Sequence, residues 1–313
     1  MIATVGYALI LAAFWMAAQH SAMGSSLGAA FPRAFASLAS LLAPLWFFAF
    51  GAADPLRKYR GGVRVALAAA LAVPYFVFAI GAPVFRWQVA ITITAFPVLL
   101  AGFLGLRDSS SRMTWRDAAA LAIITAAYFG GWFYTGWPSG TSAMFPKLFL
   151  ADVALYCFLV ARRLDGMGYS LIPSRTTSWI GIREWLFYFP FALLIGEATG
   201  FIHFHGLLPP AGTAIGTVLV TFLLIALPEE LFFRGILQNL LESRLGRTGA
   251  LILASILFGL SHFNHGSAFN WRYVLLATIA GVFYGRAWRA QRHIFASVLT
   301  HTLVDVVWSL WFR

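Results

Sequence analysis

The segment LPEELFFRG places two carboxylates and one guanidinium inside a long apolar stretch of the chain. Glu230 and Arg234 are four residues apart, so on a helix they share one face and can form an ion pair. Glu229 points about 100° away from Glu230 around the helix axis and therefore faces different neighbours. Pro228 removes one backbone hydrogen bond and can open the helix locally. A purely structural ion pair would account for Glu230 and Arg234, but it leaves the second carboxylate unexplained.

Two further apolar segments, FGLSHF and HTLVD, carry polar side chains at helical spacing. The first places His262 four residues after Phe258, and the second places Asp305 four residues after His301. Counted from the nearest basic loop residues, the acidic and histidine side chains lie roughly 13–22 Å along their helices. A single histidine on an apolar helix is most often a satisfied core residue. Three polar segments at one depth instead predict a common cavity.

These residue types suit hydrolysis. A carboxylate and an imidazole that converge can together polarise one water molecule. A second histidine with a neighbouring acid can stabilise the oxyanion that forms during attack on a carbonyl group. The sequence therefore predicts a hydrolytic site made of six residues: Glu229, Glu230, Arg234, His262, His301 and Asp305.

The rest of the chain is strongly apolar. Of 313 residues, 60% are hydrophobic and 11% are charged, and the mean hydropathy is +0.79. A soluble domain has roughly a quarter of its residues charged, so the composition excludes a soluble enzyme, a disordered chain and a nucleic-acid-binding protein. We expect an all-α, polytopic transmembrane helical bundle in contact with membrane lipid. Apolar runs of suitable length predict about eleven spans: Thr4–Ala18, Phe35–Phe50, Val65–Ile80, Val89–Leu106, Ala118–Phe133, Leu148–Val160, Trp185–Phe204, Thr213–Leu240, Ala250–Phe263, Val274–Trp288 and Ile294–Phe312.

The basic residues predict the orientation of these spans. With the N-terminus in the cytoplasm and one crossing per span, most Lys and Arg residues fall in cytoplasmic loops, as the positive-inside rule requires. The net charge of +11 is thereby explained by topology. A polar interruption, Arg162–Arg183, divides the chain into an N-terminal transmembrane region of unknown role (1–174) and a C-terminal region with the polar motifs (175–313). Because arginine far outnumbers lysine, as in GC-rich genomes, we expect a multi-pass protein of a bacterial inner membrane.

The three motifs, in this order, resemble those of the CAAX protease and bacteriocin-processing (CPBP) family of intramembrane endopeptidases. PEELFFR, FGLSH and HTLVD correspond to the EExxxR, FxxxH and HxxxN/D motifs of that family. The resemblance covers roughly Arg175–Arg313 and leaves the first half of the chain without a predicted role. It implies an intramembrane endopeptidase whose substrate is a peptide or protein, possibly lipidated, since the eukaryotic relatives process prenylated CAAX proteins.

The resemblance also implies a role for each motif residue. Glu229 would be the general base that activates the water, assisted by His262. Glu230 would be held by Arg234, and the last motif, HTLVD, would support the oxyanion through its histidine and its final acid. The best-known family members have Asn at that final position. Asp305 is a poorer hydrogen-bond donor than Asn, so it can instead orient the histidine or a metal.

The use of a metal is left open by the resemblance. Zinc catalytic sites commonly have three protein ligands and a water, and Glu229, His262 and His301 are the residues that would serve. However, the chain has no HExxH segment, which gives zinc two histidines and leaves a glutamate free as base. Glu230 would then have to be the base, and an arginine partner weakens a carboxylate as a base. We therefore favour a mechanism without a cofactor and keep zinc as the alternative.

Two other functions fit parts of the pattern. A non-catalytic immunity protein that binds a peptide toxin is one, since family relatives are associated with bacteriocin self-immunity; it predicts that Glu229→Gln keeps function. A transporter with an ion path is the other, but the sequence shows no inverted repeat and no paired broken helices. The endopeptidase is favoured because the motifs hold more acid–base groups than packing needs.

Overall fold

The backbone is helical in almost every segment of this computed structural model, as the apolar composition predicts. The structure describes residues 1–19, 22–105, 112–138, 141, 143–207, 209–264 and 269–312. Within these ranges there is no β-strand, and one isolated antiparallel bridge joins Phe204 and Phe312. The chain forms two units, Met1–Asp165 and Gly166–Arg313. The predicted functional division into residues 1–174 and 175–313 stays a prediction.

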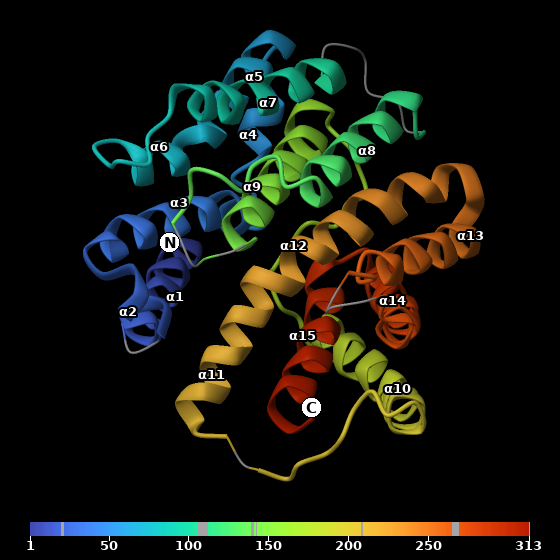
Figure 1. Ribbon diagram of the computed structural model, residues 1–313. Helices are drawn as coiled ribbons and strands as arrows, with labels where there is room; N and C mark the ends of the chain where they lie inside the picture. Colours follow the sequence, from blue (N-terminus) through green and yellow to red (C-terminus); the bar gives the residue numbers. More distant parts are fainter. Residues whose placement is uncertain are drawn as a thin grey trace. The chain divides into compact units, whose positions relative to one another are not determined.

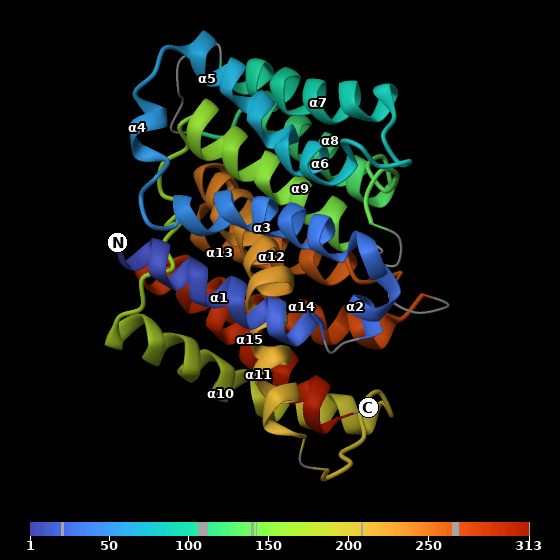
Figure 2. The same cartoon turned by 90° about the vertical axis from the view of Figure 1, so that its left-hand side faces the viewer.

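The first unit is built around α9 (Met144–Leu155) and the π-helical turn that follows it (Tyr156–Ala161). α9 lies between α3 (Phe31–Phe48) and α7 (Trp87–Gly105) (Figure 2). A buried ion pair joins Arg162, after α9, to Asp117 in α8, with 3.0 Å between Nη2 and Oδ2. The helices of this unit not yet given are α1 (Ile2–Gln19), α2 (Ala22–Leu27), α4 (Asp54–Arg57), α5 (Gly61–Leu67), α6 (Val73–Ala79) and α8 (Trp115–Phe129), with 3-10 turns at Gly28–Ala30 and Ala68–Ala72.

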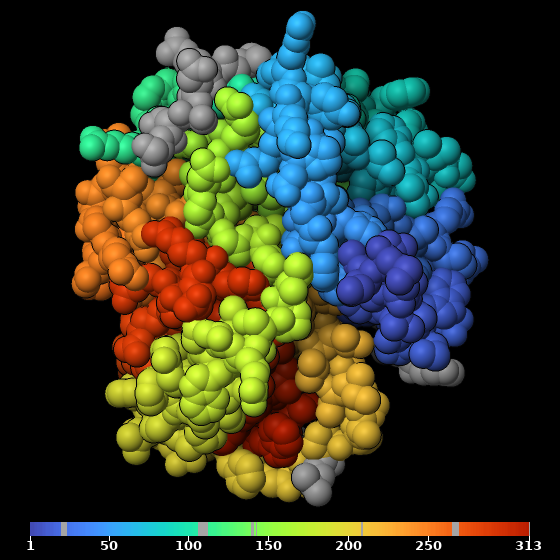
Figure 3. All heavy atoms as spheres, turned by 180° about the vertical axis from the view of Figure 1, so that it is seen from behind, coloured from blue at the N-terminus to red at the C-terminus, as the bar shows by residue number. Residues whose placement is uncertain are grey.

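α15 (Ile294–Trp311) is the central helix of the second unit. It packs against α10 (Arg175–Ala198), α14 (Trp271–Gln291) and the long helical run that begins with α11 (Ala211–Val220) (Figure 1). The space-filling view shows atoms of α15 between α10 and α11 (Figure 3). The helix that carries the HTLVD motif is thus surrounded by the other helices of its unit.

The double-glutamate motif lies where the backbone of the helical run changes from π-helical to α-helical and back. π-helical turns at Thr221–Ala226 and Leu231–Gln238 flank the short segment α12 (Leu227–Glu230). Pro228 lacks a backbone N–H, and a proline ring crowds the carbonyl four residues earlier, here Leu224 in the first π-helical turn. This explains locally why regular α-helical bonding is interrupted here. Such π-helical turns are frequent at functional sites.

All eleven predicted spans coincide with helices, but some limits differ from the prediction. α13 (Asn239–Leu260) contains a break at Gly246, with φ 68° and ψ 176°, so the eighth and ninth predicted spans join without a separate loop. α10 begins at Arg175 rather than at Trp185, because Ser174 and Thr177 cap its first turn reciprocally.

A buried and compensated charge lies within α10. Glu184 lies inside this helix with its side chain 1% exposed, and its Oε2 is 2.9 Å from Nε of Arg286 on α14. The carboxylate is therefore compensated, and the polar first turns of α10 remain helical. The predicted span Trp185–Phe204 begins directly after this charged residue and therefore leaves out the first turns of α10.

Eight helices in the described part of the chain are long and apolar enough to cross a membrane. One of the eight, Ala211–Leu260, contains two of the predicted spans, whereas α8 and α14 are not among them. The prediction of an all-α, polytopic transmembrane bundle is confirmed, and the count of eleven crossings stays a prediction.

Candidate active site

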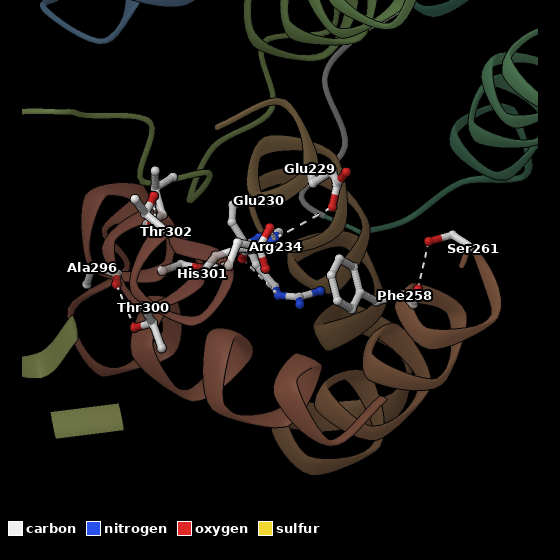
Figure 4. Close-up of polar contacts among 12 residues, drawn as sticks. Glu229, Glu230, Arg234, Phe258, Ser261, Ala296, Thr300, His301 and Thr302 are labelled. Atoms are coloured by element: carbon white, nitrogen blue, oxygen red, sulfur yellow. Dashed lines mark hydrogen bonds and ion pairs between the residues drawn. The ribbon is translucent and has the colours of Figure 1, made fainter. Parts of the chain in front are cut away.

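Glu230 lies at the centre of a buried polar network in the second unit. Its Oε2 is 3.1 Å from Nε of Arg234, the pair that the four-residue spacing predicts. The same oxygen accepts a hydrogen bond from Oγ of Ser297 on α15. The other oxygen, Oε1, lies 2.9 Å from Nδ1 of His301 (Figure 4). Because Glu230 is fully buried and both of its oxygens face donor groups, it is suited to anchor its neighbours.

The guanidinium of Arg234 is completely buried and lies among aromatic rings. Its central carbon is 4.8 Å from the ring centroid of Phe258, 5.7 Å from that of Tyr284 and 5.8 Å from that of Phe233. Aromatic faces stabilise a cation in this way, more strongly when water is excluded. The Phe of the FGLSH motif therefore has a structural explanation, since its ring covers the cation of the first motif.

Glu229 faces the two motif histidines. Its Oε2 lies 4.0 Å from Nε2 of His262, in the turn that follows α13, and 3.9 Å from Nε2 of His301 on α15. Its side chain is 17% exposed, whereas that of Glu230 is fully buried. The 100° offset between adjacent helical residues thus gives the two carboxylates separate surroundings.

His262 is oriented by its own helix. Its Nδ1 lies 2.8 Å from the carbonyl oxygen of Phe258, which can only accept, so Nδ1 carries the proton. Oγ of Ser261 is 3.2 Å from the same nitrogen. In the neutral ring, Nε2 is therefore an acceptor and lies on the side of Glu229.

His301 lies between carboxylates. Its Nδ1 faces Glu230, as described above, and its Nε2 is 3.3 Å from Oδ2 of Asp305, one turn further along α15. Tyr284 stacks on the imidazole with 4.5 Å between ring centroids and 15° between planes. The orientation of this ring is thus fixed by contacts at both nitrogens and on one face. The structure therefore brings all six predicted residues into one site.

The prediction from sequence missed two residues of this site. Ser297 is four residues before His301, so the helical spacing that paired the other motif residues points to it as well. Tyr284 lies on α14, outside the three motifs, and no spacing rule connects it with His301. Only the packing of α14 against α15 brings these two rings together.

The donor atoms of Glu229 and the two histidines are spaced more widely than two ligands of one zinc ion. Tetrahedral zinc with bonds of about 2.0–2.2 Å holds two ligand atoms about 3.4 Å apart, less than the 3.9 and 4.0 Å between Glu229 and the two histidines. Among the described residues, no group of three or more His, Cys, Asp or Glu side chains is arranged to hold a metal ion.

The fold and this site define a multi-pass helical membrane protein with a buried carboxylate–histidine centre. Residues 210–307 match the family described as Type II CAAX prenyl endopeptidase Rce1-like, and this range includes all six predicted site residues. This match supports the family that the three motifs predicted, the CAAX protease-like (CPBP) family of intramembrane endopeptidases. The match lies within the second unit. No curated protein and no solved structure matches the chain.

Proposed function

We propose that the second unit hydrolyses a peptide bond within the membrane, with Glu229 as the general base that activates a water molecule. The observation that supports this proposal is the position of Glu229 Oε2, 4.0 Å from Nε2 of His262 and 3.9 Å from Nε2 of His301. One water with hydrogen bonds of about 2.8 Å to Glu229 and to a histidine nitrogen spans such a separation. This water donates one hydrogen bond to Glu229 and the other to the unprotonated Nε2 of His262.

In this mechanism Glu229 takes a proton from the water as the water oxygen forms a bond to the substrate carbonyl carbon. The negative charge moves to the carbonyl oxygen, which lies beside the Nε2–H group of His301 and shares this donor with Oδ2 of Asp305. The carboxylates of Glu230 and Asp305 lie beside the two ring nitrogens of His301 and can each accept a hydrogen bond from it. When the C–N bond breaks, Glu229 returns its proton to the leaving amine.

The exposed fractions of the site side chains indicate which of them an entering substrate contacts first. The side chains of Asp305 and Glu229 are 27% and 17% exposed, whereas Glu230 and Arg234 are fully buried. An entering peptide therefore contacts the proposed base and the outer acid before the anchoring pair. We propose a prenylated CAAX peptide as the first probe, because the matching family is described as a CAAX prenyl endopeptidase.

The proposal is tested by comparing new protein termini in cells that express the wild type or Glu229→Gln at equal level, using terminal-peptide mass spectrometry. Glu197→Gln, a change in an exposed glutamate of α10 outside the site, is the matched control. We expect a set of termini that is present with wild type and Glu197→Gln and absent with Glu229→Gln. Identical termini in all three strains, with the cellular role of the protein intact, would favour a binding function instead.

A further inference from the structure

We infer that Ser297 is a positioning residue of this site, an inference that rests on the proposed function. Its hydroxyl holds one oxygen of Glu230 so that the other oxygen faces His301. Ser297 is fully buried on α15, and its Oγ donates to Oε2 of Glu230. Oε1 of the same carboxylate lies 2.9 Å from Nδ1 of His301. Because Ser297 and His301 are one helical turn apart, a single face of α15 holds both oxygens of one carboxylate.

Arg234 does not fix the orientation of the Glu230 carboxylate toward His301. Its Nε is 3.1 Å from Oε2 of Glu230, yet within the described residues none of its side-chain nitrogens has a hydrogen-bond partner. Arg234 therefore compensates the charge of Glu230, whereas Ser297 donates a directed hydrogen bond. The terminal torsion of a glutamate side chain is broad. Without the serine hydroxyl, the carboxylate plane is free to turn away from His301.

The neighbouring threonine hydroxyl groups of α15 bond to backbone carbonyl groups and not to a site side chain. Thr302 donates to the carbonyl oxygen of Val298 at 2.7 Å, and Thr300 lies 2.9 Å from that of Ala296 and 3.0 Å from that of Gly181 on α10 (Figure 4). Such bonds to the preceding turn are the usual arrangement for buried Ser and Thr in helices. Ser297 instead donates across to α12. Its hydroxyl therefore bonds to a side chain of the site rather than to its own helix.

The consequence for catalysis concerns the position of the His301 ring. Glu230 and the stacked ring of Tyr284 fix where Nε2 of His301 lies, and Nε2 is the atom proposed to stabilise the oxyanion. Loss of outer partners of functional histidines in metal sites lowers activity about 10- to 100-fold. We expect a loss of this size in kcat when Ser297 is replaced, with KM little changed, because no contact with the substrate is removed.

The test uses the full-length protein in detergent micelles and a fluorescence-quenched prenylated CAAX peptide. Ser297→Ala removes the hydroxyl, and Thr302→Val is the matched control, since it removes a buried hydroxyl of the same helix that bonds only to its own backbone. The double variant Ser297→Ala/Glu230→Gln is compared with Glu230→Gln alone. Should Ser297→Ala not fold, Ser297→Cys replaces it, because a thiol has similar shape and donates weakly.

We expect Ser297→Ala to lower kcat, Thr302→Val to leave it unchanged, and the serine change to cost nothing further once Glu230 is Gln. Two results would overturn the inference if the wild type cleaves the probe. One is a kcat of Ser297→Ala equal to that of Thr302→Val. The other is a loss of kcat from Ser297→Ala that is just as large in the Glu230→Gln background. A wild-type protein that cleaves neither this probe nor a peptide found by terminal-peptide analysis would overturn the proposed function itself.

Discussion

Oε2 of Glu229 in α12 lies 4.0 Å from Nε2 of His262, which lies 33 residues later in the turn after α13. The adjacent Glu230 is turned toward α15, where Ser297 and His301 contact its two oxygens. One carboxylate is therefore surrounded by donors and fully buried, and the other is partly exposed beside two imidazoles. Different surroundings let two carboxylates of one site take different roles. We assign water activation to Glu229 and anchoring to Glu230.

Replacing Arg234 with Ala is expected to destabilise the protein by about 3–5 kcal/mol, because it leaves the buried carboxylate of Glu230 uncompensated. The cleavage rate should fall as well, since Glu230 contacts His301. Thermal unfolding followed by circular dichroism measures the first effect, with Arg247→Ala, a change at an exposed arginine, as control. An Arg234→Ala variant that melts and cleaves like the wild type would show that Glu230 does not depend on this cation.

Replacing Asp305 separates its role as an acceptor from its charge. Asp305→Asn keeps an oxygen for the Nε2–H group of His301 and restores the residue of the best-known family members. We expect it to keep kcat within about tenfold of the wild type, and Asp305→Ala to lose about 10- to 100-fold more, as outer partners of functional histidines do. Steady-state cleavage of the prenylated peptide measures both. Equal losses in the two variants would mean that the negative charge, and not the acceptor, is what His301 requires.

Removal of divalent metals is expected to leave the cleavage rate unchanged. The reason is the separation of 3.9–4.0 Å between Glu229 and the histidines, which suits a bridging water better than two ligands of one zinc ion. The protein is dialysed against a chelator, its metal content is measured by mass spectrometry, and cleavage is assayed before and after zinc is added. Activity that disappears with the metal and returns with zinc alone would support the zinc alternative, with Glu229, His262 and His301 as ligands.

Much of the site could be predicted from sequence because its residues follow helical spacing. The pair Glu230 and Arg234, and the pair His301 and Asp305, are each one turn apart, and both contacts are present in the structure. The depth estimate also placed Glu229 and His262 at one level, and their side chains lie 4.0 Å apart in the structure. Local periodicity in apolar helices was sufficient for these residues.

The remaining features depend on contacts between helices that no spacing rule describes. The ring of Tyr284 reaches His301 only because α14 packs against α15. The aromatic rings around Arg234 belong to Phe233, Phe258 and Tyr284, which come from three different helical elements. Glu184 inside α10 is compensated by Arg286, a partner far along the chain that no local spacing indicates. For the first unit the sequence predicted helices and no role, because its polar groups do not form a motif.

The central claim is that Glu229 activates the water. The most direct measurement is the single-turnover cleavage rate of the Glu229→Gln variant. The substrate is the prenylated CAAX peptide or a peptide that spans a cleavage site found in cells. Gln has nearly the same shape but cannot accept the proton, so we expect the rate to fall by about 10²–10⁴-fold, the usual contribution of a general base. Glu197→Gln should cleave like the wild type, and both variants should show the wild-type melting temperature. A folded Glu229→Gln protein that cleaves as fast as Glu197→Gln would contradict the account.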